Sequence, residues 1–207
     1  MSSTAVTLNM AHLARQHPAQ TELFAAATLL SGAMMMLRVL VVVAVVNVAL
    51  VPSLALPLIL GALAQAGIGA LLAGRATSEG KEAEQLTLKN PFDLITVLKF
   101  GALLAVIMAL ANGIASWAGS PGVFALAAVS GTVDADAISL SMARMAPSTL
   151  DAPSAVIAIL IAVAANSISK VVLASTTGGL QLARLLAPAL VATLIAGGTG
   201  LWLTLQL

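Results

Sequence analysis

The sequence predicts an all-α protein, a polytopic membrane helix bundle of about six transmembrane helices that form a single transmembrane domain. Of the 207 residues, 60% are hydrophobic and 8% are charged, and the mean hydropathy is +1.06. A soluble domain is roughly 45 to 50% apolar and about 25% charged. One crossing takes about 20 apolar residues. Within a domain over 23–207, we expect spans at 23–50, 54–74, 94–118, 121–146, 152–175 and 182–206.

The segments outside these runs have a polar character. Residues 1–22 lack the compact order of basic, apolar and small residues that marks a cleaved signal, so we expect a retained cytosolic N-terminal segment. Asn90 followed by Pro91 is typical of a helix start, and it precedes the third span. The charged stretch 75–93 is expected to be a cytosolic loop that separates two spans from four.

The basic residues of the short loops predict the orientation, because cytoplasmic loops carry an excess of Lys and Arg. These residues fall on the side shared by the N-terminus and the loops after the second and fourth spans. We therefore expect both termini to be cytoplasmic. The residues concerned are Arg15, Arg75, Lys81, Lys89 and Arg144.

An internal repeat of helical hairpins is one interpretation of the chain. Residues 185–203 align with residues 54–72, and nearby Lys170 falls on Arg38. The first two spans would then match the last two in the same membrane direction. A shared bias toward Leu, Ala and Gly explains the match equally well.

Four charged residues lie deep inside the expected spans. A charge at the bilayer centre costs about 2.5 to 3.5 kcal/mol on insertion scales, so such residues need a partner or a function. Arg38 and Asp134 each lie about 18 to 20 Å from the outer end of their spans. We expect them to line a polar slot with Asp136 and Lys170, in which Arg38 and Lys170 act as counter-charges.

The spacing of the two aspartates leaves two geometries open. On an intact helix the side chains of Asp134 and Asp136 point about 200° apart. Gly131 would be a hinge at which the helix breaks and brings the carboxylates together, as in the broken helices of transporters. Alternatively the helix stays whole, and one carboxylate pairs with Arg38 and the other with Lys170.

Oxygen ligands dominate this slot, and they suit hard cations such as Mg²⁺, Ca²⁺ or Mn²⁺. A divalent cation would therefore be a substrate, and no cofactor is indicated. An Asp/Arg pair that only fixes helix packing is the alternative. The expected metal ligands are Asp134 and Asp136, and the wider ion-binding set adds Asn112, Asn166, Thr132 and Ser139.

The sequence gives no indication of an enzyme. It has no Cys, and its two histidines, His12 and His17, lie outside the spans without a carboxylate cluster around them. No catalytic triad can therefore form within the membrane. The net charge of +1 does not point to a nucleic-acid partner.

Several motifs resemble an uncharacterised bacterial membrane-domain family numbered 4010. They are the N-P-F helix start at 90–92, the G-x-x-D-x-D-A-I core at 131–138, the Asn166 and Lys170 pair, and Arg38. That domain commonly follows an MgtC/SapB-type membrane domain, and we expect this chain to be either a stand-alone version or one part of a split system. The residue before the first aspartate is Val133, where the family more often has a small hydroxyl residue, and a valine side chain supplies no oxygen ligand.

The resemblance implies a location in the bacterial inner membrane and, by analogy, a part in cation homeostasis. We expect a transporter or channel subunit for a cation, either divalent or proton-coupled. The alternatives are a non-transporting regulatory or structural partner of an MgtC-like or other membrane protein, and a small-anion carrier. Small-residue faces on the spans favour a homodimer within the lipid bilayer.

Overall fold

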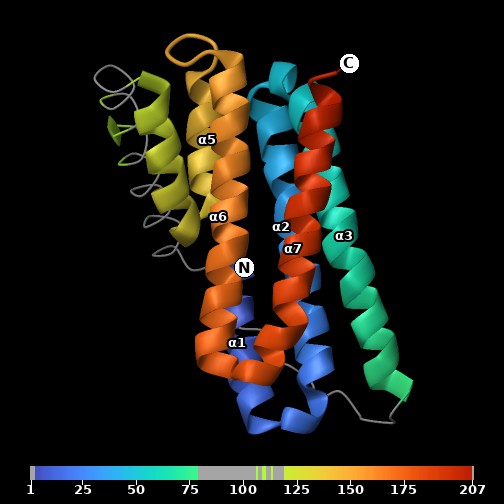
Figure 1. Ribbon diagram of the computed structural model, residues 1–207. Helices are drawn as coiled ribbons and strands as arrows, with labels where there is room; N and C mark the ends of the chain where they lie inside the picture. The colour runs from blue at the N-terminus through green and yellow to red at the C-terminus, as the bar shows by residue number, and fades with distance from the viewer. Residues whose placement is uncertain (1–2, 79–105, 107–108, 111–112, 114–118, 207) are drawn as a thin grey trace.

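The computed structural model describes residues 3–78, 106, 109, 110, 113 and 119–206, which form a bundle of helices (Figure 1). In these residues four helices are long and apolar enough to cross a membrane. The predicted helical membrane bundle is therefore confirmed. The four are α2 (Thr21–Val46), α3 (Val51–Ser78), α6 (Ala152–Gly178) and α7 (Leu180–Thr204).

Some expectations fall outside the described residues. These are the span over 94–118 apart from residues 106, 109, 110 and 113, the loop 75–93 beyond Ser78, and the ligand Asn112. Short 3-10 turns, Pro18–Gln20 and Val48–Leu50, precede α2 and α3.

The ends of α6 follow from local chemistry. Asp151 caps its start, because the side-chain oxygen accepts a hydrogen bond of 3.0 Å from the Ser154 backbone N–H. This backbone hydrogen bond also lowers the pKa of Asp151 below its usual range. At the other end Gly179 adopts φ +88°, a left-handed conformation that glycine tolerates. The chain can therefore turn back at once into α7, so that α6 and α7 form a hairpin.

The region expected as one span over 121–146 consists of two shorter helices, Gly119–Val133 and α5 (Ala135–Met145). The first runs in the same direction as α6. Its Ser120 lies 3.0 Å from Ser154 at the start of α6, between the two Oγ atoms. Farther along, the Gly131 carbonyl accepts a hydrogen bond of 2.8 Å from Asn166, midway along α6.

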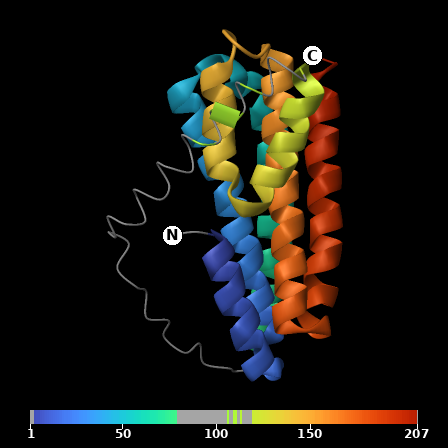
Figure 2. The same cartoon turned by 90° about the vertical axis from the view of Figure 1, so that its left-hand side faces the viewer.

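The second arm, α5, runs in the same direction as α2. Asp136 in its first turn pairs with Arg38 of α2, and Ala143 near its end accepts a hydrogen bond from Asn47, just past the end of α2. Since α2 and α6 run in opposite directions, the two arms are antiparallel and meet at Asp134 (Figure 2). They form what we call the re-entrant hairpin.

The expected single crossing over 121–146 is therefore wrong. The arms are about 22 Å and about 16 Å long at 1.5 Å per residue, which is less than the roughly 30 Å of a bilayer core. Both open ends of the re-entrant hairpin lie at one end of the bundle, and its tip lies at mid-height (Figure 2). The apolar run is long enough to cross, but it is folded in two.

The N-terminal segment forms α1 (Ser3–Gln16), which packs against α2 and α6. Its Met10, Ala11 and Ala14 are buried. A methyl group at Gly178, the last residue of α6, would lie 3.0 Å from the Ala11 carbonyl oxygen. The segment expected to be cytosolic thus lies along the half of α6 that the re-entrant hairpin leaves uncovered (Figure 1).

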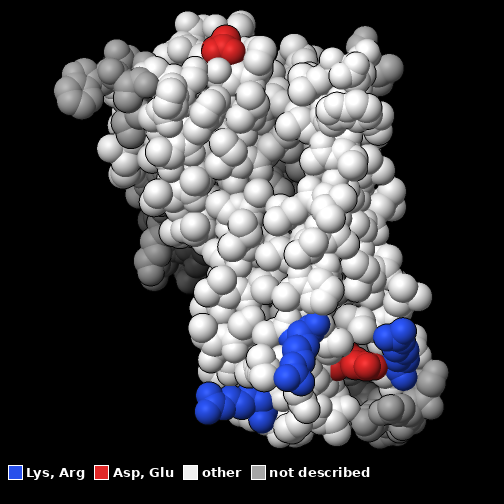
Figure 3. All heavy atoms as spheres, viewed as in Figure 1, with Lys and Arg blue, Asp and Glu red and all other residues white. Residues whose placement is uncertain are grey.

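The distribution of arginines defines two ends of the bundle. Arg15 and Arg75 lie in the last turns of α1 and α3, and Arg184 lies near the start of α7, all at the end that we call the arginine end (Figure 3). Arg144 lies in the last turn of α5, at the opposite end with Asp151. The expected placement of Arg144 beside Arg15 and Arg75 is therefore wrong, because the re-entrant hairpin turns back before it reaches them.

The direction of the helices also corrects two expectations. α2 begins at the arginine end, whereas α6 begins at the opposite end, so the α2–α3 and α6–α7 hairpins are inverted relative to each other (Figure 1). A repeat in the same membrane direction does not fit this arrangement. α7 ends opposite the start of α2, so the two termini of the bundle are not at one end.

Candidate functional site

The tip of the re-entrant hairpin is shaped by Asp134. Its backbone is extended, with φ −153° and ψ 116°, and its side-chain oxygen accepts hydrogen bonds from the N–H groups of Asp136 at 2.7 Å and Ala137 at 3.4 Å. Asp134 is thus the N-cap of α5. A short carboxylate competes well for free N–H groups at a helix start, which explains why the helix breaks at this residue.

Gly131, the expected hinge, is helical in the structure and lies three residues before the break. A Cβ at this position would lie 2.5 Å from the Ala162 carbonyl oxygen of α6. The absence of a side chain therefore allows the re-entrant hairpin and α6 to touch backbone to backbone. The Asn166 amide donates to the Gly131 carbonyl across this contact.

Asp136 makes the ion pair of the site. Its Oδ2 atom lies 2.6 Å from Nη1 of Arg38, which joins the first turn of α5 to α2. The Asp136 side chain is 16% exposed, and that of Arg38 is 47% exposed. The carboxylate also lies at the positive end of the α5 dipole. Asp134 and Asp136 thus have separate partners rather than sharing one.

Three buried oxygens near the tip have no hydrogen-bond partner among the described residues. They are Oδ1 of Asp136, Oγ of Ser139 and Oδ1 of Asn166. Asp136 and Ser139 lie one turn apart on α5, and Asn166 is bonded to the other arm through its amide nitrogen. Buried polar atoms are nearly always paired, so unpaired ones mark a place for water, an ion or strain. Each of these atoms can accept a hydrogen bond or coordinate a cation.

Lys170 supplies a second basic group. It lies one turn after Asn166 on α6, is 5% exposed, and has its Nζ 3.0 Å from the Met35 sulfur. It interacts electrostatically with Asp136, Arg38 and Asp134. Two acidic and two basic side chains are therefore grouped at the tip.

The remaining expected ligand, Thr132, lies on the outer side of the tip. Its side chain is exposed, and its hydroxyl donates to the Val129 carbonyl of its own helix at 2.7 Å. Among the described residues there is no cluster of three or more His, Cys, Asp or Glu that could hold a metal ion. A cation here would bind to one or two carboxylates with neutral oxygens.

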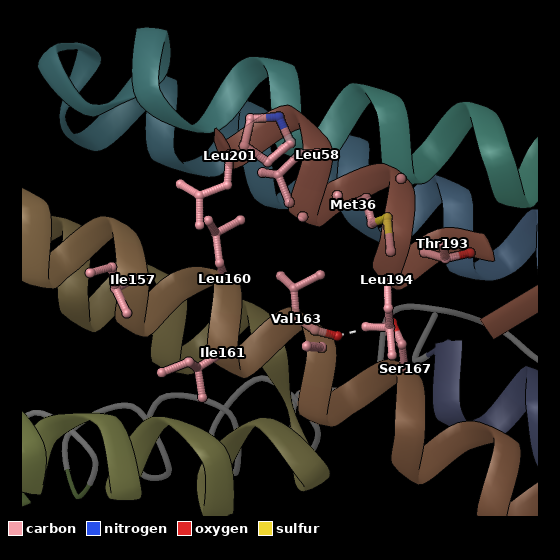
Figure 4. A pocket seen from close by; sticks show the side chains of 15 residues that line it. Met36, Leu58, Ile157, Leu160, Ile161, Val163, Ser167, Thr193, Leu194 and Leu201 are labelled. Carbon is pink, nitrogen blue, oxygen red and sulfur yellow. Dashed lines mark hydrogen bonds between the residues drawn. The ribbon is translucent and has the colours of Figure 1, made fainter. Parts of the chain in front are cut away.

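An apolar cavity of about 270 Å³ lies between α2, α3, α6 and α7 (Figure 4). Met36, Leu58, Leu160 and Leu194 line it among others. Its two hydroxyls are occupied within their own helices, since Ser167 donates to Val163 and Thr193 donates to Ala189. Such a lining offers little to an ion, so the polar chemistry belongs to the tip.

Sequence reasoning missed residues that hold the tip in place. Asn47 donates to the carbonyls of Ala143 at 3.2 Å and Ala146 at 2.9 Å, which fixes the far end of α5. Ser169 donates to the Thr132 carbonyl at 2.9 Å. The position of Asn47 at the end of an apolar run marks it as a polar residue in need of a partner. Its partner Ala143 is 96 residues away, so the sequence does not identify it.

Comparisons with known proteins give a family without an assigned activity. The family described as "Domain of unknown function (DUF4010)" matches residues 1–178, a range that ends with α6. The chain is similar to an uncharacterized protein of Aquifex aeolicus (strain VF5), with 30% identity over 172 residues, which cover 82% of this chain and 74% of that one. No solved structure matches the chain.

Proposed function

Because the chain belongs to the family described as DUF4010, whose function is unknown, we propose a function from the site itself. The protein is a transporter or channel subunit that moves a cation across the bacterial inner membrane. The cation is divalent, or its movement is coupled to protons. The carrying observation is that three unpaired buried oxygens, from Asp136, Ser139 and Asn166, lie beside a helix break at mid-height.

The chemistry of these oxygens favours a cation over an anion. A carboxylate, a hydroxyl and an amide oxygen present lone pairs, which coordinate hard metal ions and accept hydrogen bonds from water. An anion would need free donors instead. At this site the Asn166 amide donates to Gly131 and the N–H groups at the start of α5 donate to Asp134. The two basic groups, Arg38 and Lys170, contact Asp136 and the Met35 sulfur, so an anion would have to displace these contacts.

The charge balance supports movement rather than permanent storage. Arg38 and Lys170 lie close to two carboxylates, so the formal charges of the four side chains cancel. An entering cation would compete with Arg38 for Asp136. The Arg38 side chain is half-exposed and can move away, so the bound state stays weak enough to release its ion.

The orientation follows from the arginines. An excess of basic residues marks the cytoplasmic side, so the arginine end, with Arg15, Arg75 and Arg184, faces the cytoplasm in this proposal. The open end of the re-entrant hairpin then faces the periplasm.

A second candidate function has its own support in the Arg38–Asp136 pair. A partly buried ion pair between α2 and α5 can serve only to fix helix packing. The protein would then be a structural or regulatory membrane partner, either of an MgtC-like protein or of a second copy of itself. In that case neutral variants would lower stability without changing any flux.

The test is a flux measurement in proteoliposomes with Asp136→Asn. We expect cation uptake to fall at least tenfold, because the amide loses the charge that holds the ion. Uptake of Mg²⁺, Mn²⁺, Ca²⁺ and Na⁺ is measured separately, with and without a pH gradient, to identify the cation.

Asp151→Asn is the matched control. Asp151 undergoes the same chemical change at the end of the bundle, and Asn also caps helices well. Flux that is equal in Asp136→Asn and Asp151→Asn, with both proteins folded, would contradict the proposal and favour the structural partner.

A further inference from the structure

A second surface, on which four hydroxyl residues lie among apolar ones, meets the tip of the re-entrant hairpin from the side of the arginine end. It is a pocket of about 590 Å³, which we call the junction pocket. Its lining consists of Thr4 of α1, Thr132 of the re-entrant hairpin, Ser169 and Thr176 of α6, and four apolar residues of α6.

The junction pocket lies where two half-length elements meet on one helix. The re-entrant hairpin covers the first half of α6, where Gly131 lies against Ala162. α1 covers the second half, where Ala11 lies against Gly178. The junction pocket therefore lies between the re-entrant hairpin and α1, and α6 forms most of its lining.

The pocket extends from the tip toward the arginine end. Ser169 bonds to the Thr132 carbonyl at the tip, and Thr176 lies two residues before the end of α6. The distance between these two positions is about 10 Å along the helix axis. Thr132 and Thr176 are both exposed, so the junction pocket is open along this length.

Three hydroxyl groups of the lining act as hydrogen-bond donors to backbone carbonyls. Those of Thr132, Ser169 and Thr176 donate to backbone carbonyls, of Val129, Thr132 and Val172 respectively. A hydroxyl whose hydrogen is donated in this way still has lone pairs on its oxygen, which can accept a hydrogen bond or coordinate a cation. The lining therefore favours water and cations over anions.

The backbone of the tip gives an independent reason for water at this position. Non-helical backbone at membrane depth is tolerated only where it is buried in protein or lines a water-filled cavity. Asp134 has an extended backbone, and the neighbouring Val133 side chain is 65% exposed. A water-filled cavity beside the tip would meet this requirement.

We propose that the junction pocket is a hydrated half-channel through which water and cations reach the tip of the re-entrant hairpin from the arginine end. The inference rests on the proposed function for its cargo, but its hydration can be tested separately. The re-entrant hairpin would then close the path toward the opposite end, so access is from one side.

The test uses the absence of cysteine from the chain. Thr132→Cys at the tip, Thr176→Cys at the mouth and Val191→Cys on α7 are made one at a time. Val191 is 54% exposed at mid-helix and serves as the lipid-facing control. Reconstituted vesicles of known orientation receive a membrane-impermeant trimethylammonium thiol reagent on one side.

We expect Thr132→Cys and Thr176→Cys to react about tenfold faster than Val191→Cys, or more, when the reagent contacts the arginine end, because only a hydrated thiol ionises and reacts. From the opposite end Thr132→Cys should stay unlabelled. If Thr132→Cys reacts no faster than Val191→Cys, or reacts only from the opposite end, the half-channel is overturned.

Two further measurements separate this inference from the proposed function. Ser169→Cys replaces Thr132→Cys if that variant does not elute as a folded protein in gel filtration. An unlabelled pocket together with flux that depends on Asp136 overturns the half-channel alone. A labelled pocket without cation flux supports the half-channel and contradicts the proposed function.

Discussion

Arg38 and Asp136 join a full-length helix to a half-length one, through a distance of 2.6 Å between Nη1 and Oδ2. Because Asp136 is the more buried partner, loss of Arg38 leaves a carboxylate without its counter-charge. We expect Arg38→Gln to lower the free energy of unfolding in detergent micelles by about 1 to 3 kcal/mol. Adding Asp136→Asn to it should recover part of that loss. Losses that simply add would show that the pair contributes no coupling energy.

The capping role of Asp134 predicts a graded response. Asp134→Asn should keep the free energy of unfolding within about 0.5 kcal/mol, whereas Asp134→Ala should lower it by about 1 kcal/mol, because Asn caps a helix and Ala does not. Asp151, which caps α6 in the same way, is the matched position for both substitutions. Equal stability of the Asn and Ala variants at position 134 would argue against the cap.

The close contact at Gly131 predicts a steric effect. Gly131→Ala should lower the free energy of unfolding by about 1 to 3 kcal/mol, because the new methyl group overlaps the Ala162 backbone. Gly67→Ala on α3, where no atom lies within 4 Å of the added group, should be neutral or stabilising by up to about 1 kcal/mol. Of the two thermal unfolding curves, only that of Gly131→Ala should therefore shift to lower temperature. If both variants shift to lower temperature by the same amount, the result would contradict a close backbone contact between Gly131 and Ala162.

The hydrogen bonds of Asn47 predict that it anchors the far end of α5. Asn47→Leu removes two donors from the Ala143 and Ala146 carbonyls at similar volume, with an expected loss of about 1 to 3 kcal/mol in micelles. Asn9→Leu, on the exposed side of α1, should change the stability by less than about 0.5 kcal/mol. If both variants unfold like the wild type, Asn47 does not anchor the end of α5.

The direction of the helices predicts opposite labelling of the two ends. His17→Cys and Gln206→Cys both lie at exposed positions outside the long helices. An impermeant thiol reagent should reach position 17 from the side of the arginine end and position 206 from the other side. Labelling of both from one side would contradict this direction of the helices.

The hydropathy of the sequence was sufficient to predict the long helices, but it did not predict the re-entrant hairpin. α2, α3, α6 and α7 follow from apolar runs of the right length. The run 121–146 has the length of a crossing too, and its fold depends on contacts distant in sequence, from Asn47 and Asn166. No local rule gives the direction in which the chain continues after the break at Asp134.

The candidate site was partly accessible to the same reasoning. The cost of charge in a membrane singles out Arg38, Asp136 and Lys170, and the structure groups them. The role of Asp134 as a cap rather than a shared ligand could not be read from spacing, because it depends on which backbone N–H groups the break leaves free. Likewise the unpaired oxygen of Asn166 exists only because its amide nitrogen is engaged by Gly131.

The length of the re-entrant hairpin also decides which compartment receives everything that follows it. A run that turns back halfway returns the chain to the side it came from, while the same run extended as one helix would deliver it to the other side. Destroying the cap at Asp134 and straightening the run would thus exchange the sides of α6 and α7 at almost unchanged hydrophobicity. The turn at Asp134 therefore determines on which side of the membrane each of the following helices begins.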